Sequence, residues 1–178
     1  MKDLKRFNIQ YVGLKDENHL FEYQIDNTFF EAFNFDEFFN SDIHISVELL
    51  KKPTMLQIQF HATGSVNVAC DLSGEPFDLK ISATLPLIVK FGEAFNNDNE
   101  EVIVLPYSEY QLNIAQYIYE MIVLAIPTKR IHPQVIDGTL ESEALKKLEK
   151  LRVHEEKSTE EVDPRWDKLK SLITEKKT

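Results

Sequence analysis

Apolar and polar residues alternate over the central third of the chain. From Leu56 to Cys70 the even positions are apolar or glycine, and most odd positions are polar. A period of two, held for fifteen residues, predicts a long strand with one buried face. Gly64 interrupts the apolar series, and we interpret it as the site of a bulge or bend, because so long a strand rarely stays straight.

The same alternation recurs on both sides of this strand. Residues 43–49 and 77–91 repeat it, and the linkers KKPT and DLSGEP join them to the central strand. Three strands joined by short turns predict an antiparallel meander. Pro86 has no N–H for a ladder hydrogen bond, so it predicts an edge or a bend at its position.

Shorter runs add elements around this meander. Alternation at residues 7–11 and 21–25 predicts two short strands, and VIVL at 102–105 predicts another. The stretch FFEAFNFDEFF at 29–39 is crowded with Phe, and we interpret it as a short helix or an aromatic plug at one end of the sheet.

Helical spacing begins later in the chain. An apolar stripe predicts a helix at 113–126 that covers the sheet, with Asn113 as its N-cap and Pro127 as its stop. This stripe consists of Ile114, Ile118, Met121, Ile122 and Ala125. A narrower stripe on a charged helix follows, made of Leu140, Ala144, Leu148 and Leu151.

The C-terminal stretch VDPRWDKLKSLI holds the single tryptophan of the chain. Asp163 suits an N-cap and Pro164 suits the first helical position, so we predict a short amphipathic helix. Its apolar stripe contains Trp166, Leu169, Leu172 and Ile173. An isolated helix of this length is marginal in water. It therefore needs a surface to dock on, either its own domain in cis or a partner in trans.

These patterns together predict an α+β fold. We expect a twisted antiparallel β-meander or half-open barrel covered by one helix, followed by a charged C-terminal helical tail. Residues 1–136 would form the acidic β-rich domain with its covering helix. Residues 137–178 would form the charged tail that ends in the DPRW helix.

Charge is distributed unevenly along the chain. The total is −10, but residues 1–126 hold 8 Lys and Arg against 19 Asp and Glu, whereas residues 127–178 hold 12 against 11. Affinity for nucleic acid comes largely from cations that replace counterions, so the acidic body favours a basic protein partner over RNA. Acidity that only keeps the protein soluble is the alternative. The amino-terminal sequence MKDLKRFNIQYVG has no apolar signal region and the chain has one cysteine, so we predict a cytoplasmic protein that contacts no membrane.

Catalytic motifs are not recognisable in the sequence. It contains no glycine-rich phosphate loop, no G-x-S-x-G and no H-E-x-x-H, and its carboxylates are dispersed. Cys70 is on the apolar side of its predicted strand, so we interpret it as a buried thiol that packs as a small hydrophobe. His132 follows the predicted covering helix, and we interpret it as a loop residue, with a role as a ligand as the alternative.

Three segments resemble the YceD-like family, also called large ribosomal RNA subunit accumulation protein. They are the hairpin VNVACDLSGEPFDLKI, the helical segment NIAQYIYEMIVLAIPTKRIHP and the C-terminal DPRWDKLKSL, of which the last is the most specific. The resemblance implies a role in accumulation or processing of large-subunit rRNA, with no established enzymatic activity. At the level of residues, it implies little beyond the motif of Asp163, Pro164, Arg165 and Trp166, together with Cys70.

The sequence departs from this family at the hairpin turn. Many members carry a Cys-x-x-Cys pair there, a spacing that suits structural zinc. This chain reads Cys70-Asp71-Leu72-Ser73, so the second thiol is missing. Cys70 and His132 supply at most two of the four ligands that a closed zinc site needs. We therefore predict neither a bound metal nor a cofactor.

The resulting prediction is a non-enzymatic ribosome-biogenesis factor. It would bind a large-subunit ribosomal or assembly protein, with rRNA as a second candidate partner. The expected anchors on the tail are Asp163, Pro164, Arg165, Trp166, Leu169 and Leu172. The alternatives are an RNA-processing hydrolase that uses the dispersed carboxylates, and an adaptor unrelated to ribosomes. The oligomeric state and the directness of RNA contact are left open by the sequence.

Overall fold

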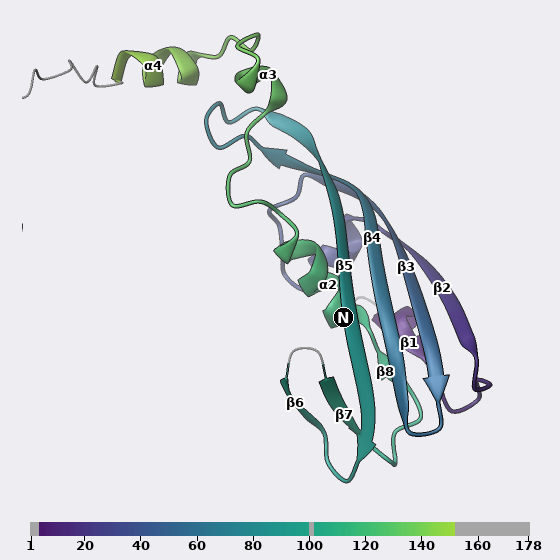
Figure 1. The fold of residues 1–178 in the computed structure, drawn as a ribbon. Helices are drawn as coiled ribbons and strands as arrows, with labels where there is room; N and C mark the ends of the chain where they lie inside the picture. The colour runs from purple at the N-terminus through teal and green to yellow at the C-terminus, as the bar shows by residue number, and fades with distance from the viewer. Residues whose placement is uncertain (1–3, 100–101, 152–178) are drawn as a thin grey trace, which may run out of the picture.

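The computed structural model describes residues 4–99 and 102–151 (Figure 1). These residues form a long curved sheet with helices on its concave side and at one end. The elements of the sheet are β2 (Asn18–Ile25), β3 (Asn40–Lys52), β4 (Met55–Ala69), β5 (Pro76–Gly92), β6 (Asn96–Asn99) and β7 (Val102–Pro106). The others are the 3₁₀ helix η1 (Leu4–Phe7), β1 (Asn8–Ile9), α1 (Asn27–Glu31), β8 (Leu112–Asn113), α2 (Ala115–Leu124), α3 (Pro133–Ile136) and α4 (Glu143–Leu151).

The predicted meander is confirmed. Strands β2, β3, β4 and β5 are neighbours in that order, and each pair is antiparallel. Alternate residues of β4 are buried over most of its length, as the period of two requires. The buried series contains Leu56, Ile58, Phe60, Ala62, Val66 and Val68.

The predicted bulge at Gly64 is wrong. The register between β3 and β4 runs from Lys52↔Met55 to Asn40↔Asn67 without a shift, and Gly64 pairs directly with Ile43. A Cβ atom on Gly64 would lie 2.2 Å from the carbonyl oxygen of Asp42. Glycine is needed there because the two backbones approach too closely for a side chain.

Beyond β5, the sheet is no longer a simple meander. Strand β7 runs parallel to β5 and pairs with it only from Ile88 onward, and β6 forms an antiparallel edge strand beside β7. Pro86 is paired with Gln59 of β4, but on its other side β7 pairs with β5 only from Ile88 onward, so the expected edge position is confirmed on that side. Strands β2 and β6 end the strand order of the described residues, so the sheet is not closed into a barrel.

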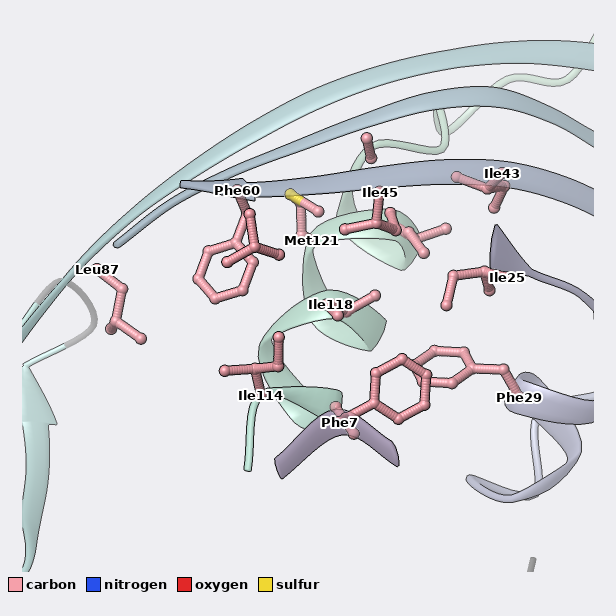
Figure 2. Close-up of a cluster of buried hydrophobic side chains, with 14 of the residues drawn as sticks. Phe7, Ile25, Phe29, Ile43, Ile45, Phe60, Leu87, Ile114, Ile118 and Met121 are labelled. Atoms are coloured by element: carbon pink, nitrogen blue, oxygen red, sulfur yellow. The ribbon is translucent and has the colours of Figure 1, made fainter. Parts of the chain in front are cut away.

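Helix α2 covers the concave face of the sheet, as predicted (Figure 2). Its buried residues are Ala115, Ile118, Met121 and Ile122, which pack with Phe60 and neighbouring sheet residues in one core. The helix begins at Ala115, two residues later than expected, because Asn113 belongs to β8. The Asn113 side chain still accepts a hydrogen bond from the Ala115 N–H at 3.0 Å, which caps the first turn.

The N-terminal segments complete the core. Only Asn8–Ile9 of the predicted strand at 7–11 is a strand, and it pairs with β8 outside the main sheet. The Phe-rich stretch forms α1 and a cluster of aromatic rings against α2, in which Phe33 stacks on Tyr119 with 4.4 Å between ring centroids. Among the described residues, no helix is long and apolar enough to cross a membrane.

A candidate partner-binding surface at the hairpin tip

The turn that joins β4 to β5 is clamped to the segment after α2. The Asp71 N–H donates to the Arg130 carbonyl oxygen at 2.8 Å, and the Arg130 N–H donates to Asp71 Oδ2 at 2.7 Å. The Arg130 guanidinium also lies 3.4 Å from Asp71 Oδ1 and 3.2 Å from Glu37 Oε2. We call these contacts of Glu37, Asp71 and Arg130 the tip clamp. They fix the chain that leaves α2 against the hairpin.

Cys70 is buried beside this clamp, as the sequence predicted. Its side chain is 2% exposed, and its Sγ accepts a hydrogen bond from the His132 N–H at 3.3 Å. Burial raises the pKa of the Cys70 thiol, but donors from His132, Ser73 and Leu72 outweigh it, so the pKa lies below its usual value. The thiol therefore works as a hydrogen-bond acceptor that holds the turn in place.

The residues at this turn do not fit a structural zinc ion. Ser73 stands where a second thiolate would be needed. The ring of His132 packs edge-on against Phe77 at 5.3 Å between centroids, and its Nδ1 accepts the Gln134 N–H at the start of α3. His132 is thus a helix cap, in agreement with its interpretation as a loop residue. In the described part of the chain, no three His, Cys, Asp or Glu side chains gather into a set that could hold a metal.

A groove of about 710 Å³ opens next to the clamp, between the hairpin turn, α3 and α4. Its walls are mostly apolar, and Glu149 is the one charged residue among them. Large side chains at this end of the fold remain open to solvent: Ile136 is 72% exposed, and Leu148 and Leu151 are exposed beside it. The lining residues are Leu72, Ile131, Val135, Ile136, Gly138, Leu140, Leu145, Leu148 and Glu149. We call this feature the tip groove.

The tip groove was not expected from the sequence. Helix α3 is too short to show a period, and the groove draws single apolar residues from the turn, α3 and α4. Of the apolar stripe predicted for the charged helix, Leu140 and Leu148 line the groove, although Leu140 lies before α4 begins at Glu143. Ala144 and Leu151 are not among the lining residues, whereas Leu145 is. The sequence signal was limited to the presence of an apolar residue, Leu72, in an otherwise polar turn.

The anchors predicted on the tail, Asp163, Pro164, Arg165, Trp166, Leu169 and Leu172, lie outside the described residues. The last described residue, Leu151, ends α4, which forms one wall of the tip groove. In the sequence, residues 152–162 separate this helix from the DPRW motif.

The chain matches a known protein family over more than half of its length. The sequence model of the family described as "Large ribosomal RNA subunit accumulation protein YceD" matches residues 58–173. The chain belongs to the YceD family. The match begins within β4 and includes the tip clamp residues Asp71 and Arg130, the tip groove and the DPRW motif. No curated protein and no solved structure matches the chain.

Membership of the YceD family ties the chain to large-subunit rRNA accumulation. The family description names this role and no chemical reaction.

Proposed function

We propose that this chain is a non-enzymatic ribosome-biogenesis factor that supports accumulation or processing of large-subunit rRNA by binding a large-subunit ribosomal or assembly protein. Its membership of the YceD family carries this proposal, because that family is described by its effect on large-subunit rRNA. The site that we propose for binding consists of the tip groove and the DPRW segment that follows it.

Three features support a protein as the direct partner. Residues 1–126 carry a net charge of −11, which repels a phosphate backbone and attracts a basic protein. The tip groove offers apolar walls of the kind that receive side chains of a partner rather than phosphate groups. Trp166 and Arg165 are residue types that often anchor protein interfaces.

The geometry suggests how the two parts act together. Helix α4 lines the groove, and the DPRW motif follows it in the sequence after residues 152–162, so we propose that one partner engages both. The tail supplies the amphipathic stripe of Trp166, Leu169 and Leu172, which a partner would receive as a helix in a groove. We propose that the DPRW helix is stable only when it is docked, because an isolated helix of this length is marginal in water. This would account for the position of the single tryptophan near the end of a charged tail.

The test is an affinity capture with the full chain and its Trp166→Ala variant at physiological salt, with and without ribonuclease. Large-subunit precursor rRNA and identified ribosomal or assembly proteins are scored. Thr174→Ala is the matched control, because Thr174 lies on the polar face of the predicted tail helix. We expect one large-subunit protein to survive nuclease with the wild type and Thr174→Ala and to be lost with Trp166→Ala.

Other outcomes separate the alternatives. Complete loss of captured material on nuclease treatment would show that the chain binds RNA directly, and its retention would then fall steeply with salt. Equal capture by wild type and Trp166→Ala would remove the tail from the binding site. Unchanged levels of large-subunit rRNA in cells that lack the protein would contradict the proposed function itself.

A further inference from the structure

One margin of the curved sheet is an open strand edge. Strand β2 is the first in the strand order β2-β3-β4-β5-β7-β6, so among the described strands only β3 pairs with it. Figure 1 shows β2 at this margin. Within the described part of the chain, residues 18–25 make backbone hydrogen bonds to β3 alone. The other side of β2 therefore presents unpaired backbone groups.

The ladder between β2 and β3 determines which backbone groups of β2 face outward. The Lys51 N–H donates to the Glu17 carbonyl oxygen at 3.2 Å, and the register continues without a shift from Asn18↔Leu50 to Ile25↔Ile43. Hydrogen-bonded and non-hydrogen-bonded positions alternate in an antiparallel pair. The odd-numbered residues of β2 therefore bond to β3, and the N–H and C=O groups of the even-numbered residues point away from it. These even-numbered residues are Asn18, Leu20, Glu22 and Gln24.

The other long edges of this sheet carry features that discourage further pairing. Proline, lysine, short length and irregular register are the usual protections of an edge strand. β6 has four residues and an irregular register with β7. The part of β5 that β7 leaves unpaired contains Pro76, Lys80 and Pro86. β2 has eight residues, no Pro or Lys and a regular register, so among the described edges it is the one best suited to receive another strand.

Contacts at both ends hold β2 in place. Directly after β2, the Asn27 side chain at the start of α1 donates to the Phe39 carbonyl oxygen at 3.0 Å, next to the start of β3. Before β2, Lys51 Nζ donates to the Leu14 carbonyl oxygen at 2.6 Å. The edge is therefore already ordered, which reduces the entropic cost of adding a strand to it.

The two faces beside this edge favour different side chains on an added strand. Phe21 and Tyr23 are half-buried against the core, which lies on the concave side of the sheet. Leu20 alternates with them and therefore lies on the convex side, where it is 59% exposed, as is its neighbour on that face, Glu22. A strand paired with β2 would place apolar side chains against Phe21 and Tyr23 and its alternate residues beside Leu20 and Glu22.

Carboxylates surround the middle of the edge on its convex side. Leu20 pairs with Glu48, and the Gln24 side chain donates to the Asp42 carboxylate. Glu22 Oε1 lies 3.5 Å from His44 Nε2. Residues 18–25 and 40–50 contain no Lys or Arg. The cations nearby flank this stretch, and they are Lys15, Lys51 and Lys52 at the Asn18 end and Arg6 near Asp26 at the other.

We propose that the outer edge of β2 binds an extended segment of a basic protein as an added strand, with a Lys or Arg beside Glu22 and apolar residues against Phe21 and Tyr23. The inference rests on the proposed function only for the identity of the partner as a large-subunit ribosomal or assembly protein. A second copy of the chain would bring its own Glu22 and a net charge of −10 to the same edge, so charge favours a basic partner over self-pairing.

The test measures amide hydrogen exchange of the full chain by NMR, with and without a synthetic ten-residue peptide in which Val alternates with Arg. In the free protein we expect slow exchange at the odd-numbered residues of β2, which bond to β3, and fast exchange at the even-numbered ones. The peptide should slow exchange at the even-numbered residues. The same peptide with N-methylated backbone amides is the ligand control and should leave these rates unchanged.

Two variants at one position isolate the backbone contact. Leu20→Pro removes an N–H that faces away from β3, so the ladder inside the sheet is kept. We expect it to weaken peptide binding about tenfold, because one ladder hydrogen bond is lost and the proline ring occupies the space of the added strand. Leu20→Thr keeps the N–H and the preference for a strand, and should change binding by no more than about twofold. Melting temperatures show that both variants remain folded.

Several results would overturn the inference. Slow exchange at the even-numbered residues in the free monomer would show that the chain itself covers this edge. Slow exchange that appears only at high protein concentration and is lost with Leu20→Pro would make a second copy the occupant. A peptide that protects none of these amides, or an N-methylated peptide that protects them equally, would also exclude an added strand.

The outcomes for this edge and for the tail are distinguishable. Trp166→Ala should bind the peptide as the wild type does, because the tail is not part of the β2 edge. Failure of the peptide test leaves capture through Trp166 intact, whereas a failure of that capture leaves the exchange pattern of β2 unchanged.

Discussion

At Gly64 a single residue determines how closely two long strands can pair. A Cβ atom there would lie 2.2 Å from the Asp42 oxygen and 2.7 Å from the Ile43 Cα, and both of these atoms belong to backbone. We expect Gly64→Ala to lower the free energy of unfolding by roughly 1–3 kcal/mol, because one strand must shift to admit the methyl group. Denaturant unfolding monitored by circular dichroism measures this loss.

Gly13 provides the control for this substitution. A Cβ atom on Gly13 meets nothing within 4 Å, so Gly13→Ala adds the same methyl group without a clash. A Gly64→Ala variant as stable as the Gly13→Ala variant would show that the close backbone approach has no energetic importance.

Asp26 stabilises the start of α1 through its charge. It is the N-cap of that helix, and its Oδ1 accepts the Thr28 N–H at 3.0 Å. The hydrogen bond from the Thr28 side chain is the main cause that lowers the pKa of Asp26 below its usual value. A lowered pKa means that stabilisation is complete above the unfolded-state pKa and is lost as the pH falls through the folded-state value.

We therefore expect Asp26→Ala to cost about 1 kcal/mol of unfolding free energy at pH 7 and less at strongly acidic pH. Asp26→Asn keeps the side-chain acceptor and should cost less at pH 7. Unfolding free energies of the wild type, Asp26→Ala and Asp26→Asn, measured from pH 7 down to strongly acidic pH, test this prediction. A loss from Asp26→Ala that stays constant over this range would contradict a charge-dependent cap.

At the scale of elements, the sequence predicted those strands that have one buried and one solvated face. β2, β3, β4 and β5 follow a period of two because each lies in the curved sheet with the core on one side only. β6 could not be predicted, because its residues Asn96–Asn99 are all polar. The parallel pairing of β5 with β7 depends on a tertiary contact that no local pattern encodes.

The candidate site was predictable to a smaller extent. The DPRW motif was visible because its composition is unusual, and Cys70 was expected to be buried from its position in the period. The tip clamp joins Asp71 to Arg130 across 59 positions, and both are ordinary surface residue types. The tip groove likewise exists only once the turn, α3 and α4 come together.

The tip clamp allows a prediction about the hairpin as an element. Asp71→Ala removes the acceptor of the Arg130 N–H and the ion pair with its guanidinium. We expect faster amide hydrogen exchange at Arg130 and His132, with a change in global unfolding free energy of no more than about 1 kcal/mol, because the pair is partly exposed.

Glu75→Ala changes an exposed acidic side chain of the same turn and serves as the control. Exchange at Arg130 should not change in this variant. Equal exchange rates in wild type and Asp71→Ala would show that Cys70 and the backbone alone hold the segment to the hairpin.

At the scale of the whole molecule, the long sheet carries the tip groove at one of its ends. The fifteen residues of β4 span about 50 Å at about 3.3 Å per residue. The tip groove lies at the end where β4 turns into β5.

The final prediction tests whether the tail serves stability or binding. The core of the described residues extends from Phe7 to Ile122 and lies within the predicted acidic domain of residues 1–136. We expect a chain that stops after Leu151 to have the melting temperature of the full chain within about 2 °C, because no buried core residue of the described part is removed. The same chain should lose the partner that Trp166 captures. A clearly lower melting temperature would instead mean that the DPRW helix docks in cis on its own domain, and the apolar tip groove is the surface that we would then test for it.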